Sequence, residues 1–137
     1  MTEDKNHGIN VYLDDSGVYP KYSVYRSWTF PSGNEEKEMF LATSYEVSRE
    51  TIGNPPIYLI ISTNKNVNST NEVSRAIDYG KTPKKAIKKM LKYARKCAIS
   101  DARSLLRQGN KFTFKSEDPR IKLPSDLEKQ LTALNKR

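Results

Sequence analysis

Residues 82–109 read TPKKAIKKMLKYARKCAISDARSLLRQG, a segment that is long and regular enough to form one extended helix around which the rest of the chain is expected to pack. Thr82 is a favourable N-cap residue, and Pro83 suits the first helical position, where no amide hydrogen is needed. Gly109 is a typical C-terminal stop. The pattern predicts a helix over residues 83–108, which is roughly 39 Å long at about 1.5 Å per residue.

The predicted helix has an apolar side and a basic side. The apolar side is formed by Ile87, Met90, Leu91, Ala94, Cys97, Ala98, Ala102 and Leu105. The basic side is formed by Lys85, Lys88, Lys89, Lys92, Arg95, Lys96, Arg103 and Arg107. Asp101 is the one acidic residue of the stretch, and it projects toward the apolar side. We expect the apolar side to anchor the helix on a sheet, which leaves the basic side facing solvent or a partner.

The charge of the chain is concentrated around this helix. Residues 81–115 contain twelve Lys or Arg and one acidic residue, whereas the other 102 residues contain 12 basic and 15 acidic residues. The net charge is therefore +11 in this block and −3 elsewhere, which together give +8. A concentrated positive field attracts a phosphate backbone, an acidic protein surface or an anionic membrane. A solvated face that only keeps the protein soluble has the same composition.

The first half of the chain is predicted to form strands, because polar and apolar residues alternate there. The expected strands cover residues 9–13, 18–30, 36–47 and 57–61. In the second of these, Arg26 is a charged residue on the apolar face, and Tyr19, Lys21 and Tyr25 share the other face. Turn-forming residues and short connections separate the strands, which is typical of an antiparallel meander.

Three shorter elements are predicted around the long helix. Ser69 and Glu72 have the spacing of a capping box, which favours a short helix that ends at Gly80. Residues 111–115 are predicted to form a last strand. Ser125 starts a second capping box, and the helix that follows places three leucines on its inner side, at Leu127, Leu131 and Leu134.

These elements predict a single α+β domain that spans residues 1–137. We expect an antiparallel β-meander of three to four strands packed on a long basic amphipathic helix, with smaller flanking helices. Residues 1–7 are polar and are expected to form a flexible tail. No stretch reaches the roughly 18 apolar residues of a membrane span or has the apolar core of a signal peptide. We therefore expect no membrane association and an intracellular location.

Residues that carry enzyme chemistry are scarce. His7 is the only histidine and Cys97 the only cysteine, so the chain has no internal disulfide, no zinc-binding set and no second histidine to activate a nucleophile. Asp15 and the acidic and lysine residues at 35–37 have the residue types of metal-dependent nucleases, but both lie in predicted turns. We therefore expect a non-enzymatic protein without a metal or a cofactor.

The sequence favours an accessory or regulatory protein that binds the phosphate backbone of DNA or RNA. The predicted contacts are the eight residues of the basic side together with Lys111. Lys outnumbers Arg on this side by five to three, which favours phosphate contacts over base readout. Tyr19 and Tyr25 flank Lys21 and are candidates for stacking on bases, although they equally fit packing within the protein. The alternative is a small inhibitor or adaptor whose basic face docks on an acidic surface of a nucleic-acid-handling protein complex.

Overall fold

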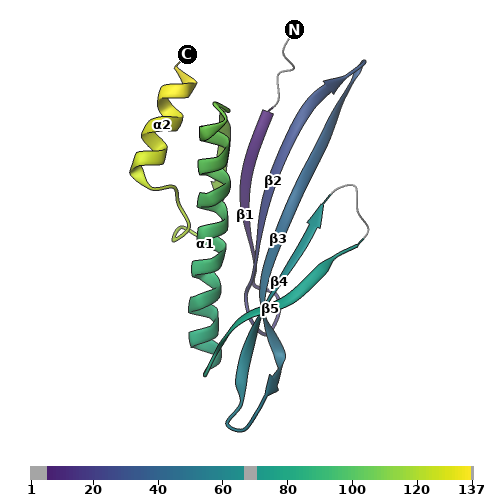
Figure 1. Cartoon of the computed structure of the whole chain (residues 1–137), viewed down its shortest axis with the longest axis vertical. Helices are drawn as coiled ribbons and strands as arrows, with labels where there is room; N and C mark the ends of the chain where they lie inside the picture. Colours follow the sequence, from purple (N-terminus) through teal and green to yellow (C-terminus); the bar gives the residue numbers. More distant parts are fainter. Residues whose placement is uncertain (1–5, 67–70, 137) are drawn as a thin grey trace.

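The protein is described here by a computed structural model, which covers residues 6–66 and 71–136. Figure 1 shows a twisted sheet with both helices on one side of it. The strands are β1 (Asn6–Asp14), β2 (Lys21–Ser32), β3 (Glu35–Ile52), β4 (Ile57–Asn66), β5 (Val73–Gly80) and β6 (Phe112–Ser116). The helices are α1 (Pro83–Arg107) and α2 (Ser125–Asn135).

The six strands form one sheet in the order β5-β4-β3-β2-β1-β6. β1 to β5 pair as an antiparallel meander, whereas β6 lies parallel to β1. α1 connects the strand at one edge to the strand at the other edge and contacts β1 to β5 on the way. The α+β class and the packing of the long helix on a meander are confirmed, but the sheet is mixed and has six strands rather than three or four.

The segment that the sequence predicts as a short helix after Ser69 is the strand β5. Ser69 lies outside the described residues, and the chain from Val73 to Gly80 pairs with β4. So short a helix has little intrinsic stability, whereas pairing satisfies the backbone groups of β4. A Cβ atom on Gly80 would lie 2.4 Å from the backbone nitrogen of Ala86, so glycine is needed where α1 starts against the end of β5.

Two further differences concern the ends of elements. β1 begins at Asn6, so His7 lies in a strand between β2 and β6 and not in a tail, while residues 1–5 lie outside the described part. Ser125 is the first residue of α2, but Pro124 occupies the N-cap position and no side chain caps the helix. At α1, in contrast, the predicted cap is confirmed, because Thr82 Oγ1 accepts a hydrogen bond from the Lys85 amide at 3.1 Å.

The core lies between the sheet and α1. The helix presents a small or flexible residue to the sheet at every fourth position, namely Ala86, Met90, Ala94, Ala98 and Ala102. Alanine lets the helix come close to the strands, and all five side chains are fully buried. From the sheet, the core receives Ile9, Val11, Tyr22, Val24, Tyr45, Val47 and Ile60. The predicted apolar side of the helix is therefore the packed side, with partly buried residues only at its margins.

The buried carboxylate of Asp118 anchors the segment between β6 and α2 to the sheet through hydrogen bonds. Asp118 is 2% exposed and accepts hydrogen bonds from the hydroxyl of Tyr22 on β2 and from Arg120, whose Nη2 atom lies 2.7 Å away. The bonds from Arg120, and then the bond from Tyr22, hold the pKa of Asp118 well below its usual range, although burial opposes this. Burial, together with Asp118, raises the pKa of Tyr22 to about 12.

We expect the Asp118→Asn variant to lose stability near neutral pH. The loss of charge-assisted hydrogen bonds should lower the free energy of unfolding by about 1–3 kcal/mol at pH 7. A carboxylate with a lowered folded-state pKa stabilises the fold above about pH 4, and this contribution disappears as the pH falls toward the folded-state value. The difference in the free energy of unfolding between the variant and the wild type should therefore become smaller below about pH 4. Urea denaturation followed by circular dichroism measures the free energy of unfolding at each pH. A loss of stability that is independent of pH would contradict the stabilising role of the ionised Asp118 carboxylate.

Candidate nucleic-acid interface

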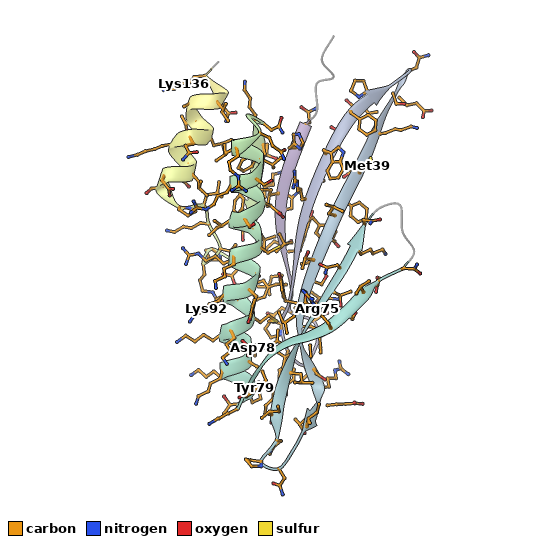
Figure 2. The ribbon with its side chains drawn as sticks, viewed as in Figure 1. Met39, Arg75, Asp78, Tyr79, Lys92 and Lys136 are labelled. Atoms are coloured by element: carbon orange, nitrogen blue, oxygen red, sulfur yellow. The ribbon has the colours of Figure 1, made fainter. Side chains whose placement is uncertain are left out.

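The side of α1 that faces away from the sheet carries the predicted basic residues. All eight are exposed: Lys85, Lys88, Lys89, Lys92, Arg95, Lys96, Arg103 and Arg107. Lys111, which follows the helix, is exposed as well. Figure 2 shows Lys92 pointing away from the sheet. At about 1.5 Å per residue, the row from Lys85 to Arg107 is roughly 33 Å long.

Lys89 differs from the other basic residues of α1 because it is engaged with β5. Its Nζ atom donates to the carbonyl oxygen of Tyr79 at 2.9 Å and lies 3.6 Å from the carboxylate of Asp78. The same ammonium is 5.3 Å from the centroid of the Tyr79 ring, which is within cation–π range. The Tyr93 hydroxyl also donates to Asp78, at 2.9 Å, so this cluster ties α1 to the edge strand. Lys89 therefore has a structural role.

The other seven of the eight predicted basic side chains form no ion pair with any described residue. The first turn of the helix, where the helix dipole favours an acidic residue, contains none and carries Lys84 and Lys85 instead. Like charges four residues apart, such as Lys88 and Lys92, cost roughly a few tenths of a kcal/mol per pair. This arrangement lowers the stability of the helix, so folding alone does not explain it.

The two charged residues that interrupt the predicted apolar faces are both partly buried and lie near enough for their charges to interact. Asp101 on α1 faces Arg26 on β2, whose positive charge favours the ionised carboxyl. Burial has the larger effect and raises the pKa of Asp101. Burial likewise raises the pKa of the Cys97 thiol, one turn earlier on the helix. Cys97 is therefore protonated at neutral pH and is not an activated nucleophile.

The structure separates the two tyrosines that the sequence places on one face. β2 begins at Lys21, so its alternation does not reach Tyr19, which packs against the core and is partly buried. Tyr25 lies on the face of the sheet opposite α1. Its ring centroid is 5.1 Å from that of Tyr12 on β1 and 5.9 Å from that of Phe40 on β3. Sequence reasoning missed Tyr12 and Phe40, because only strand pairing makes them neighbours of Tyr25.

The residues with the composition of a nuclease site are far apart. Asp15 follows β1 beside the start of β2, whereas residues 35–37 begin β3 beside the end of β2. The length of β2 separates the two groups, so they do not form one centre. Within residues 6–66 and 71–136, no three His, Cys, Asp or Glu side chains are placed to hold a metal ion.

Comparisons of the chain with protein-family models, with curated proteins and with solved structures find no significant match. Neither α1 nor α2 is long and apolar enough to span a membrane, and no other helix occurs among the described residues. The function is therefore inferred from the surface of this protein alone.

Proposed function

We propose that the protein is a non-enzymatic nucleic-acid-binding accessory or regulatory protein, which contacts the phosphate backbone of DNA or RNA through α1. The observation that carries the proposal is a row of exposed basic side chains on α1 that have no ion-pair partner among the described residues, namely Lys85, Lys88, Lys92, Arg95, Lys96, Arg103 and Arg107. A linear row of cations suits a polyanion, because each phosphate contact releases condensed counterions and so adds to the affinity.

The composition of this surface supports nucleic acid over an acidic protein as the partner. Protein interfaces usually have an apolar or aromatic centre that contributes most of the binding energy. The large exposed hydrophobic side chains of the described chain are Tyr12, Val18, Leu41, Ile52, Val73 and Tyr79, and none of them belongs to α1. The exposed side of α1 thus offers charge without an apolar anchor, which fits phosphates better than a protein surface.

Binding to a duplex is expected to weaken steeply as salt is added. If six or seven basic groups neutralise phosphates, log K plotted against log salt should have a slope of roughly −5 to −6. The affinity should be similar for unrelated sequences, because phosphates carry no base information. Fluorescence anisotropy with random-sequence DNA and RNA duplexes at several salt concentrations measures both quantities. A flat salt response would exclude phosphate contacts, and tight binding to an acidic protein alone would support the adaptor function instead.

A further inference from the structure

The face of the sheet opposite α1 is left open by both helices (Figure 1). At the centre of this open face, Tyr12, Tyr25 and Phe40 form a diagonal ladder of rings across β1, β2 and β3. Tyr12 is 46% exposed. Apolar and aromatic side chains that gather in one exposed patch, rather than lying scattered, mark interaction surfaces.

In the strand register, the neighbours of these rings on the open face are mainly neutral polar and basic residues. The row through the middle ring consists of Lys115, Asn10, Tyr25, Ala42 and Lys65. The row on one side of it consists of Tyr12, Ser23, Ser44, Thr63 and Ser74. The row on the other side consists of Thr113, Gly8, Ser27 and Phe40. These three rows contain no acidic residue, and a lysine stands at each end of the middle row.

The open face is also hollowed. A depression of about 630 Å³ lies over Asn10, Tyr12, Tyr25 and Phe40, with the acidic Asp14 and Glu38 among the residues at its margin. A second depression of about 890 Å³ extends over β1 and β6 and includes Lys111 and Lys115. Both lysines belong to the basic stretch of residues 81–115, so the second depression carries part of its charge.

We propose that the open face binds single-stranded nucleic acid, with unpaired bases stacked on Tyr12, Tyr25 and Phe40. Stacking on aromatic rings accepts any base, since every base has a π-face. Asn10 and the surrounding hydroxyl groups offer donors and acceptors to the exposed base edges, as sheet surfaces that bind RNA do. Lys115 lies where the phosphates of a strand crossing the sheet would pass. Lys65, at the other end of the middle row, is paired with Glu72 at 3.7 Å. A duplex fits this face poorly, because its bases are stacked within the helix.

This inference rests on the proposed function for the class of ligand, which is nucleic acid. It places that ligand on a different surface, the open face of the sheet. α1 and the open face lie on opposite sides of the sheet, so substitutions on one surface leave the other unchanged. We therefore expect α1 to favour a duplex and the aromatic rings to favour a single strand. The two preferences can be measured separately.

The test compares an eight-nucleotide single strand with a duplex by fluorescence anisotropy. Tyr12→Leu and Tyr25→Leu should each weaken single-strand binding by about tenfold, as expected for the loss of one stacked base. Tyr25→Phe keeps the ring and should bind nearly as well as wild type. Tyr79→Leu is the matched control, because Tyr79 is 44% exposed but lies on β5 outside the ladder, so its loss should not weaken single-strand binding. Duplex binding should be unchanged in the Tyr12 and Tyr25 variants.

Photocrosslinking gives an independent readout. An oligonucleotide that contains 5-bromouracil should crosslink to peptides from β1, β2 or β3 and not to α1. Unchanged single-strand affinity in the Leu variants, or crosslinks confined to α1, would overturn the open-face proposal even if α1 binds a duplex. Conversely, single-strand binding that depends on the rings, without duplex binding at α1, would refute the α1 contact and leave the open face as the nucleic-acid site.

Discussion

Replacing Lys88 and Lys92 together by glutamate is expected to abolish most duplex binding while the protein stays folded. Both side chains are exposed and unpaired among the described residues, so each is free to contact a phosphate. Losing two phosphate contacts should make the salt slope shallower by about 2. The reversed charges also repel the backbone, so the affinity should fall by at least tenfold. Anisotropy over a salt series measures the change.

A matched control distinguishes the effect of where the charge lies from the effect of total charge on duplex affinity. Replacing Lys37 and Arg49 by glutamate changes the net charge by the same amount, but both are exposed residues of β3 and not of α1. This control should retain most of the affinity. The α1 variant should also unfold at the same or a slightly higher temperature, because glutamates at 88 and 92 pair with neighbouring lysines of the helix. Equal losses in both variants would show that only overall charge matters, which would remove α1 as the binding surface.

Truncating Leu105 to alanine is expected to cost about 2–5 kcal/mol of unfolding free energy, because a fully buried leucine leaves a cavity. Leu105 has no exposed surface and belongs to the core between α1 and the sheet. Urea denaturation followed by circular dichroism measures the loss. Under conditions in which the variant is folded, its affinity for a duplex should equal that of wild type.

Leu91 provides the comparison for Leu105 on the same helix. It is only partly buried against the core, so Leu91→Ala should cost clearly less than Leu105→Ala. If Leu105→Ala were silent and the reversal of Lys88 and Lys92 unfolded the protein, the packed and exposed sides of α1 would have been assigned the wrong way round. The proposed role of the basic side would then lose its support.

Much of α1 and of the meander could be predicted from the sequence, since both depend on local patterns. The 3.6-residue period of the helix predicted which side chains lie on its basic side and which on its apolar side. The predicted N-cap at Thr82 is also confirmed. The chain from Val73 to Gly80 was predicted wrongly, because its weak helical signal is outweighed by pairing with β4, a partner that lies in another segment. A strand was predicted over residues 111–115 and is found as β6, but its parallel pairing with β1 depends on the path of α1 across the sheet.

A long basic helix with one side for packing and one side left for solvent or a partner follows from the local sequence, because side-chain direction repeats with the helix turn. Which residues from different strands become neighbours depends instead on the tertiary structure. It placed Asp101 near Arg26, packed Tyr19 against the core, and placed Tyr12 and Phe40 beside Tyr25. Neighbours across a sheet follow from strand order and register, which arise from pairing between distant segments and leave no periodic signal in any one of them.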